Sequence, residues 1–200
     1  MKEKIGVLAV QGAFREHRQV LEKLGAEVVE VRSKNDLEGI EGLIIPGGES
    51  TAIGKQLEMD GFGERIVQMA QAGCPIFGTC AGMILLSKRI EQSKQYSLGL
   101  LDTLVRRNAF GRQVASFEAD LPVKGFQGKE LRAVFIRAPY VLEADPQVEI
   151  LAKYEDKIVF VRQGNILATA FHPELTEDTR VHEYFLKMVP DKADRKEQSC

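Results

Sequence analysis

The chain has 200 residues, of which 44% are hydrophobic and 28% are charged, and its formal net charge at pH 7 is -2. This length suits one domain with a sizeable core, and the charge gives no reason to expect a nucleic-acid or membrane surface. No apolar run is long enough to span a bilayer, and the polar start Met1-Lys2-Glu3-Lys4 does not resemble a signal peptide. Three cysteines without framework spacing favour a reducing compartment, so we expect a cytoplasmic location.

The first half of the chain alternates short apolar runs with amphipathic segments. The predicted strands are residues 5–10, 27–31, 43–45 and 75–78, and the predicted helices are residues 14–24, 50–59 and 62–72. Either Ser50 or Thr51 could cap the second of these helices. Alternation of strand and helix predicts parallel pairing with right-handed crossovers, and hence a single doubly wound α/β sheet flanked by helices.

The second half is richer in strands. We predict strands at residues 101–106, 114–118, 131–136, 150–154, 158–162 and 166–171. Gly164-Asn165 is typical of a tight hairpin turn, which predicts extra antiparallel strands in this half. A final helix is predicted from about Thr179 to Val189. Residues 191–200 are charged and aperiodic, so we expect one domain over residues 1–190 and a disordered tail.

The segment Gly78-Thr79-Cys80-Ala81-Gly82 lies where a predicted strand passes into an apolar, helix-like stretch. A glycine two positions before and two positions after one reactive residue is typical of a nucleophile elbow, a sharp turn with a strained middle residue. Unpaired N–H groups and the helix dipole at such a position favour the thiolate form of a cysteine. A buried structural thiol is the alternative for Cys80, but the paired glycines favour a nucleophile.

A cysteine nucleophile needs a base, and the chain contains three histidines. His172 follows the last predicted strand, so it emerges at the carboxyl edge of the sheet, as does the Cys80 loop. The next residue is a proline, which disfavours helical backbone, and in an extended chain Glu174 would lie on the same side as the imidazole and orient it. We expect His17 to be packed in the core and His182 to be solvated among surface charges.

The loops at this edge also offer groups that could stabilise an oxyanion. The N–H of Ala81 lies at the predicted helix start, and an N–H of the Gly47-Gly48 loop could supply the second donor. Glu49 places a carboxylate at the mouth of the site. Arg107 and Arg137 could contact a charged substrate, although arginines are more often solvated.

Together these motifs resemble the triad segments of class I (triad-type) glutamine amidotransferases. Further stretches narrow the resemblance to the glutaminase subunits of pyridoxal phosphate synthases, the PdxT family. These stretches are Val10-Gln11-Gly12-Ala13, Arg15-Glu16-His17, Pro46-Gly47-Gly48-Glu49-Ser50-Thr51, Arg107-Asn108-Ala109-Phe110-Gly111-Arg112-Gln113, Ser116-Phe117-Glu118-Ala119-Asp120, Phe135-Ile136-Arg137-Ala138-Pro139 and Phe171-His172-Pro173-Glu174-Leu175-Thr176-Glu177-Asp178. The resemblance covers all but the tail and implies the flavodoxin-like class I fold.

The resemblance also implies an activity, the hydrolysis of L-glutamine to L-glutamate and ammonia. Cys80 would form a glutamyl thioester, His172 would relay the proton to ammonia, and Glu174 would hold His172. Glutamine would be bound by Gly48, Glu49, Ser50, Arg107, Ile136 and Arg137, the oxyanion hole would comprise Gly48 and Ala81, and Gln11 and Gly12 would lie beside it. The ammonia would pass to a separate (β/α)8-barrel subunit that makes pyridoxal 5'-phosphate, and we expect the free chain to be weakly active until that subunit docks.

Three other interpretations fit parts of the sequence. They are a glutaminase serving another synthase, such as one of histidine biosynthesis, a hydrolase or chaperone-like protein with an elbow cysteine, and a catalytically silent binding subunit. The His-Pro-Glu sequence argues against the second, and the intact triad argues against the third. No nucleotide-binding glycine motif is present, and His172 and Glu174 lack a third ligand at suitable spacing, so we expect neither a cofactor nor a metal.

Overall fold

The computed structural model describes residues 2–108 and 116–190, so the predicted tail at residues 191–200 lies outside the described residues. The helices are α1 (Phe14–Lys23), α2 (Ser50–Glu58), α3 (Phe62–Gln71), α4 (Ala81–Leu86) and α5 (Arg180–Leu186), with 3-10 turns η1 (Lys34–Leu37) and η2 (Pro173–Leu175). The strands are β1 (Lys4–Leu8), β2 (Glu27–Val31), β3 (Gly42–Ile45), β4 (Ile76–Thr79), β5 (Ser87–Ile90), β6 (Leu101–Arg106), β7 (Ser116–Leu121), β8 (Leu131–Ile136), β9 (Tyr140–Ala144), β10 (Glu149–Tyr154), β11 (Lys157–Gln163) and β12 (Ile166–Thr169).

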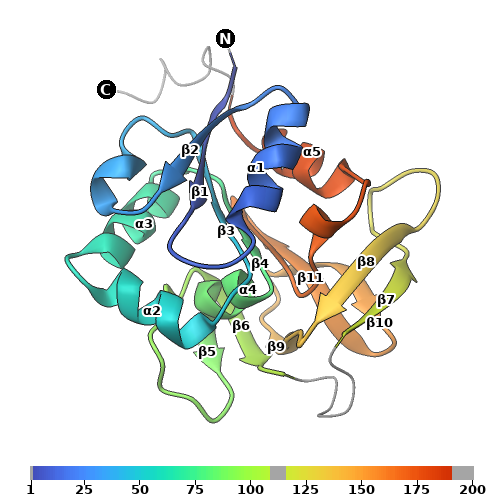
Figure 1. Cartoon of the computed structure of the whole chain (residues 1–200). Coiled ribbons are helices and arrows are strands. Elements are labelled where there is room, and N and C mark those ends of the chain that lie inside the picture. Colours follow the sequence, from blue (N-terminus) through green and yellow to red (C-terminus); the bar gives the residue numbers. More distant parts are fainter. Residues whose placement is uncertain (1, 109–115, 191–200) are drawn as a thin grey trace.

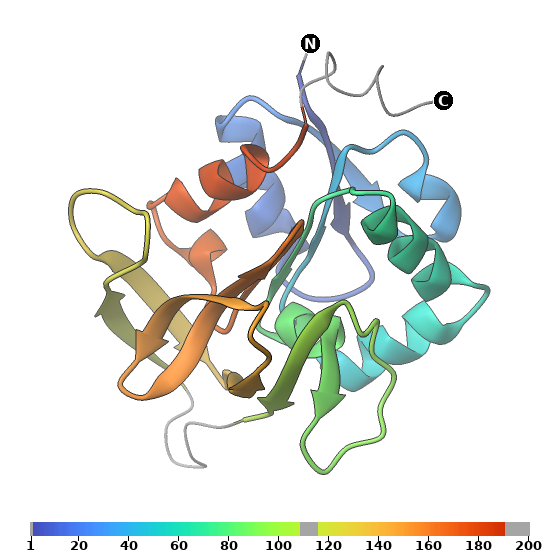
Figure 2. The same cartoon turned by 180° about the vertical axis from the view of Figure 1, so that it is seen from behind.

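The strands of the first half form the parallel part of one sheet. The spatial order begins β2-β1-β3-β4-β12, and every neighbouring pair in this series is parallel. The strands β3, β4 and β12 are buried along their whole length, as expected when helices cover both faces of a sheet. In both views α1 and α5 lie on one side of these strands, and α2 and α3 lie on the other (Figure 1 and Figure 2). The predicted doubly wound sheet is therefore confirmed.

Mostly antiparallel strands extend this sheet on the far side of β12, although β5 at its edge is parallel to β6. The order continues β11-β9-β6-β5, with β10 also paired to β11, while β7 and β8 form a separate two-stranded sheet. Gly164-Asn165 is the two-residue turn between β11 and β12, and Gly164 has the positive φ of 57° that such a turn requires.

Two strands were not predicted from the sequence. β5 follows directly on α4, and its two middle residues are an exposed lysine and arginine, so it shows no apolar alternation. β9 begins just after a proline and combines apolar residues with a glutamate. The predicted strand at 114–118 begins at Ser116 in the described residues and runs to Leu121. Residues 114 and 115 lie outside them.

Aromatic packing fixes the strand that leads into the predicted base. The ring of Phe171, which directly precedes His172, lies 5.7 Å from the ring of Phe135 on β8 and 5.8 Å from that of Phe160 on β11. All three rings are fully buried. Buried aromatic pairs of this geometry stabilise the fold by more than the apolar area they bury, so the backbone at His172 has little freedom to move.

Among the described residues, no helix is long and apolar enough to cross a membrane.

Candidate active site

The pairing of β4 with β12 brings the predicted nucleophile and base together. Thr79 and Thr169 are register partners at the carboxyl ends of these adjacent parallel strands, and the Cys80 N–H donates to the Thr169 carbonyl at 2.8 Å. After these two strands the backbone leaves the sheet at the same edge, which is where reactive groups of α/β proteins are usually found. His172 emerges beside Cys80, since a Cβ placed on Gly47 would lie against both side chains, and Cys80 acts to raise the pKa of the imidazole.

Cys80 occupies a strained turn, as the sequence predicted. Its φ of 50° and ψ of -100° lie outside the regions that L-residues favour. Both flanking glycines are required by close approach: a Cβ on Gly78 would lie 2.6 Å from the Gly82 carbonyl carbon, and a Cβ on Gly82 would lie 2.1 Å from the Ile45 oxygen. The turn brings the Cys80 thiol to the end of β8, where it donates weakly to the Ile136 carbonyl at 3.7 Å.

His172 and Glu174 form the second contact of the triad. Nδ1 of His172 lies 2.7 Å from Oε1 of Glu174, which leaves Nε2 for the thiol of Cys80. The expected geometry was wrong in one respect, because Glu174 reaches the imidazole from the 3-10 turn η2 and not from extended chain. The tight turn that begins at Pro173 folds the carboxylate back toward the preceding residue.

Burial and hydrogen bonding oppose each other in this pair. Burial alone would lower the pKa of His172, but its hydrogen bonds with Cys80 and Glu174 raise that pKa to about 10. Burial alone would raise the pKa of Glu174, whereas the nearby His17 and His172 hold it below its ordinary value. The site therefore favours a protonated imidazole beside an ionised carboxylate, the charge state that can donate a proton to a leaving amine.

The glycine loop between β3 and α2 packs directly against the triad. A Cβ on Gly47 would lie 2.4 Å from Cε1 of His172, so only glycine fits there without displacing the imidazole. The Gly47 N–H donates to Oγ1 of Thr79 at 3.1 Å. A Cβ on Gly12 would lie 1.6 Å from the Gly47 oxygen, and Oε1 of Gln11 accepts from the Glu49 N–H at 3.4 Å. Both predicted loops therefore meet beside Cys80.

Glu49 is the N-cap of α2, so the sequence prediction of a Ser50 or Thr51 cap was wrong. Its carboxylate accepts from the N–H groups of Thr51 at 3.0 Å and Ala52 at 2.8 Å, and these bonds lower the pKa of Glu49. The helix already begins at Ser50, and a glutamate can reach the same orphan donors. Oε1 of Glu49 also lies 3.6 Å from Nη2 of Arg107.

Gln95 joins three of the polar residues at this site, and it was not predicted from the sequence. Its Oε1 accepts from Nη1 of Arg107 at 2.7 Å, and from the hydroxyls of Thr51 at 3.3 Å and Ser50 at 3.4 Å. Gln95 lies in the segment between β5 and β6, which has no motif or periodicity to mark it. It fixes the guanidinium of Arg107 beside the carboxylate of Glu49.

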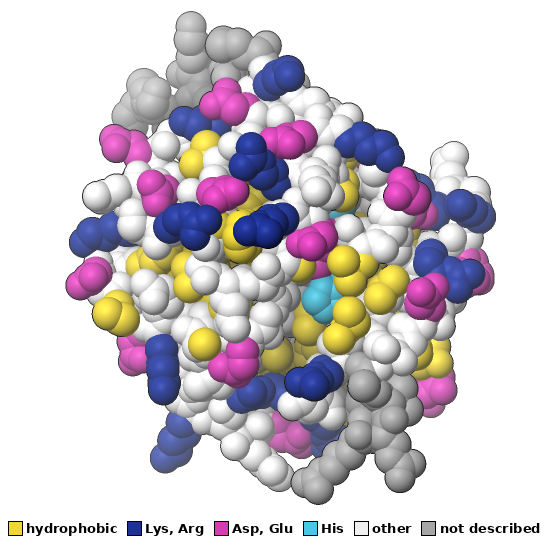
Figure 3. Space-filling view, viewed as in Figure 1, with side chains coloured by type: hydrophobic (Ala, Val, Ile, Leu, Met, Phe, Trp, Pro, Cys, Tyr) yellow, Lys and Arg dark blue, Asp and Glu magenta, His cyan; other side chains and the backbone are white. Residues whose placement is uncertain are grey.

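The end of β8 borders the site opposite the glycine loop. Ile136 supplies the carbonyl that faces the Cys80 thiol, and its own side chain is 38% exposed. Arg137 follows with a positive φ of 45°, and among the described residues its guanidinium takes part in no ion pair. The structure thus brings Ile136 to Cys80 but places no described acidic group against Arg137. Hydrophobic side chains gather around a histidine on this face of the molecule (Figure 3).

The two other histidines are both buried. His17 is packed in the core as predicted, but the prediction for His182 was wrong, since its side chain is fully buried. Nε2 of His182 lies 2.9 Å from Nδ1 of His17. Helical spacing puts His182 on the same inward side of α5 as Val181 and Phe185, and the flanking charges that suggested solvent lie on the other side.

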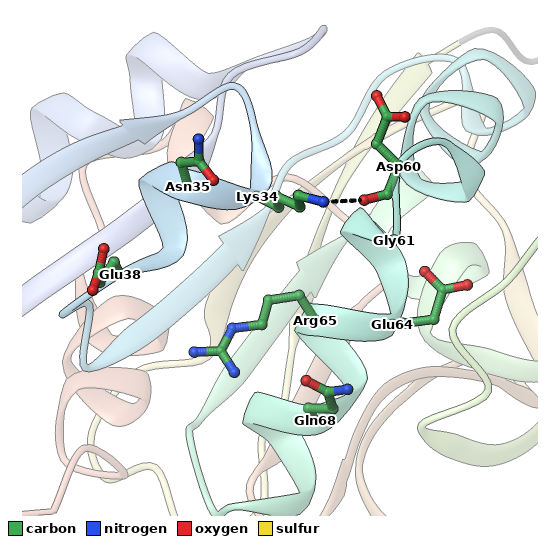
Figure 4. A pocket seen from close by; sticks show the side chains of 8 residues that line it. All are labelled: Lys34, Asn35, Glu38, Asp60, Gly61, Glu64, Arg65 and Gln68. Atoms are coloured by element: carbon green, nitrogen blue, oxygen red, sulfur yellow. Dashed lines mark hydrogen bonds between the residues drawn. The ribbon is translucent and has the colours of Figure 1, made fainter.

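A separate polar pocket of about 450 Å³ lies between η1 and the start of α3 (Figure 4). Lys34 donates across it to the Asp60 carbonyl at 2.8 Å, and Arg65 and Glu64 also line it. It contains no residue of the triad or the glycine loop. Among the described residues, no group of three His, Cys, Asp or Glu side chains could hold a metal ion.

Comparison with known proteins assigns the chain to a family. The sequence model of the SNO glutamine amidotransferase family matches residues 7–191. A protein of Moorella thermoacetica named pyridoxal 5'-phosphate synthase subunit PdxT is 60% identical over 93% of this chain and 99% of its own length. A protein of the same name from Pelotomaculum thermopropionicum is 57% identical over 98% of both chains.

Solved structures agree with this assignment. A crystal structure described as a glutamine amidotransferase superposes with a TM-score of 0.88 at 51% identity, over 92% of this chain and 98% of that one. The structure of PurLQS from Thermotoga maritima, at 20% identity and a TM-score of 0.72 over 95% of this chain and 100% of that chain, shares the fold. With the family match over residues 7–191, these similarities establish that the chain belongs to the SNO glutamine amidotransferase family.

Proposed function

We propose that this chain is the glutaminase subunit of a pyridoxal 5'-phosphate synthase. It hydrolyses L-glutamine to L-glutamate and ammonia and delivers the ammonia to a synthase subunit. The observation that carries the proposal is the convergence of Cys80, His172 and Glu174 at the ends of two adjacent strands, in a chain 52–60% identical to eight proteins named as PdxT subunits.

The first half of the reaction forms a thioester. The Cys80 thiolate attacks the side-chain amide carbon of glutamine, and the N–H groups of Gly48 and Ala81 stabilise the oxyanion that develops on the amide oxygen. The C–N bond then breaks, and the nitrogen takes the proton from Nε2 of His172 to leave as ammonia. Glu174 accepts from Nδ1 of His172 throughout, which fixes the tautomer and stabilises the imidazolium.

The second half restores the enzyme. Neutral His172 takes a proton from water, and the resulting hydroxide attacks the glutamyl thioester at its carbonyl carbon. The C–S bond breaks, glutamate is released, and the thiolate of Cys80 again faces a protonated His172. The high pKa of His172, about 10, supports this role, because the imidazole returns to its protonated form after each turnover.

Glutamine is recognised by residues at the edge of the site. Arg107, held by Gln95 and close to Glu49, offers a guanidinium to the α-carboxylate of the substrate. Ser50, Ile136 and Arg137 complete the proposed contacts. Gln11 and Gly12 support the glycine loop from the other side, where a side chain on Gly12 would collide with the Gly47 carbonyl.

We also propose that the partner is a (β/α)8-barrel synthase. Ammonia is mostly protonated at neutral pH and is then a poor nucleophile, so its direct transfer to the synthase is useful. A glutaminase that worked without its partner would waste glutamine. We therefore expect the isolated chain to be weakly active, with its oxyanion donors misaligned until the synthase docks.

Glutamate release by the wild type and by Cys80→Ala, each with and without the barrel synthase, tests the proposal. We expect turnover from the wild type alone to be slow, turnover with the synthase to be faster, and none from the variant. Substantial turnover by Cys80→Ala would refute the nucleophile, and full activity without the synthase would refute the gating. Activation by another synthase only would favour a glutaminase of a different pathway.

A further inference from the structure

A chain of buried polar side chains runs from the core to the acid of the triad. Nε2 of His182 lies 2.9 Å from Nδ1 of His17, and Nε2 of His17 lies 3.2 Å from Oγ1 of Thr79 and 3.4 Å from Oε2 of Glu174. The side chains of His17, His182 and Thr79 are fully buried, and Glu174 is 5% exposed. Burial of this many polar groups is costly unless they satisfy one another.

The unpaired atoms of this chain determine where its protons lie. Among the described residues, Nδ1 of His182 and Oε2 of Glu174 have no hydrogen bond of good geometry. If His17 carried its proton on Nδ1, His182 would need a proton on Nδ1, a buried donor without an acceptor. The lone pair of His17 Nε2 would also face the Glu174 carboxylate. Both consequences are unfavourable.

The opposite assignment leaves neither imidazole with a buried N–H that lacks an acceptor. His182 then carries its proton on Nε2 and donates to Nδ1 of His17, and His17 carries its proton on Nε2. That proton is donated to the Thr79 hydroxyl at 3.2 Å, and the second carboxylate oxygen of Glu174 lies 3.4 Å from the same nitrogen. Burial lowers the pKa of both histidines, that of His182 to about 3, so both imidazoles are neutral in this arrangement.

We propose that His17 is a positioning residue for the amide hydrolysis, and that it donates its Nε2–H to Oε2 of Glu174 and keeps this carboxylate ionised and aimed at His172. The proposal rests on the glutaminase function proposed above. Its physical basis is that Glu174 uses Oε1 for His172 and would otherwise hold a buried anionic oxygen without a donor. The 3.4 Å separation is long for a hydrogen bond, and such contacts in unliganded sites tighten when substrate is bound.

Other titratable groups act on the same network and enter its pH dependence. Around Glu174 these are His17 from α1 and His172 from its own loop, and around His17 they are Glu174, His172 and Glu16. His182 from α5 is influenced by His17 and Glu174, and Cys80 acts on His172. Without the donor from His17, the pKa of Glu174 should rise, so that Glu174 takes up a proton at a higher pH and no longer orients His172.

Three variants of His17, tested in complex with the barrel synthase, separate this role from simple packing. His17→Leu removes the donor at similar volume. His17→Gln places an amide N–H near the position of Nε2, and His17→Asn places one near Nδ1, too short to reach Glu174. Phe185→Leu is the control, because its ring lies 5.7 Å from that of Phe77, which in turn faces both buried histidines.

The measurement is kcat and KM for glutamine as a function of pH. We expect His17→Leu and His17→Asn to lower kcat about 10- to 100-fold, as loss of an orienting partner commonly does, to leave KM within about twofold, and to move the acid limb of kcat to higher pH. His17→Gln should restore most of the rate and the wild-type limb, and Phe185→Leu should not move the limb.

An acid limb that stays at its wild-type position in folded His17→Leu would overturn the proposal. If that variant does not fold, an unmoved limb in His17→Asn has the same meaning, and equal loss in His17→Gln and His17→Leu also contradicts it. Absence of glutamate release by the wild-type complex would instead refute the proposed function. The two failures are therefore distinguishable.

Discussion

Oγ1 of Thr79 accepts a hydrogen bond from the backbone N–H of Gly47 at 3.1 Å. Thr79 is the last residue of β4 and the immediate neighbour of Cys80, whereas Gly47 belongs to the loop after β3. This one bond therefore fixes the glycine loop relative to the nucleophile. The orientation of the Gly47 peptide in turn determines where the N–H of Gly48 lies.

Loss of the Thr79 hydroxyl should impair the rate more than substrate binding. Thr79→Val keeps the shape of the side chain but leaves the buried Gly47 N–H without an acceptor, which costs about 1–3 kcal/mol of stability. A displaced oxyanion donor should lower kcat by about 10- to 100-fold, because a shift of about 1 Å can have that effect. Steady-state kinetics and urea unfolding check both numbers. Thr79→Ser retains the hydroxyl and is the matched control, and an equal loss in both variants would contradict the role of the bond.

The second prediction concerns the space at Gly47. In Gly47→Ala the new Cβ would lie 2.4 Å from Cε1 of His172 and 3.4 Å from Cβ of Cys80, so the imidazole must move. We expect glutamate release to fall by at least about 100-fold while the far-UV circular dichroism spectrum is retained. Gly128→Ala serves as control, since its Cβ meets no atom within 4 Å and its positive φ costs only local strain. Normal activity of Gly47→Ala would show that His172 has another productive position.

The third prediction tests the contact between Gln95 and Arg107. Gln95→Leu removes the acceptor of the 2.7 Å bond from Arg107, and the freed guanidinium should bind glutamine less well. We expect KM to rise about 10-fold, the equivalent of about 1.4 kcal/mol, with a smaller change in kcat. Gln95→Glu keeps an acceptor for Arg107 and should change KM less. A lower kcat with an unchanged KM would place Gln95 in the chemical step instead.

The two buried histidines make the fold sensitive to acid. Burial lowers the pKa of His17, and lowers that of His182 to about 3, while both start from an ordinary value of 6.5. Between these values the unfolded chain binds more protons than the folded protein, so the free energy of unfolding decreases as the pH falls from about 6.5 toward 3. The slope is at most about 1.4 kcal/mol per pH unit for each histidine.

Urea unfolding measured from about pH 7 down to about pH 4 tests this pH dependence. His182→Phe should reduce the slope of the free energy of unfolding against pH by the contribution of one histidine, because the variant has one fewer group to protonate on unfolding. Burial alone would raise the pKa of Glu174, but His17 holds it lowered, so loss of the Glu174 charge adds to the instability at the acid end of the range. An identical slope in the wild type and His182→Phe would show that His182 is already protonated in the folded protein.

Local pattern was sufficient to predict most of the fold. Buried apolar runs such as Leu43-Ile44-Ile45 and the two-residue turn at Gly164-Asn165 are determined by neighbouring residues, and both were predicted correctly. β5 was missed because its sequence, Ser-Lys-Arg-Ile, has no strand periodicity. This segment is a strand because it pairs with β6. Strand order across the sheet depends on such distant pairings, and they have no signature within a short window.

The site divides in the same way. Cys80, His172 and Glu174 carry motifs in which the chemistry requires particular neighbours, so each could be predicted from its own segment. The contacts of Gln95 and the inward orientation of His182 depend on packing between elements far apart in the chain. The charged residues next to His182 in the sequence led to the wrong prediction that it is solvated. The N-cap of α2 was predicted at Ser50 or Thr51, after the observed Glu49, because glutamate is a less common N-cap than serine or threonine.

The adjacency of β4 and β12 has a consequence during synthesis on the ribosome. Every residue up to the elbow emerges well before the strand that carries the imidazole, so a growing chain holds its sulfur without any base or acid beside it. Only insertion of β12, the last strand that the structure describes, between β4 and β11, which are both made earlier, completes the proton-transfer pair. The order of translation thus keeps unfinished chains from splitting amides.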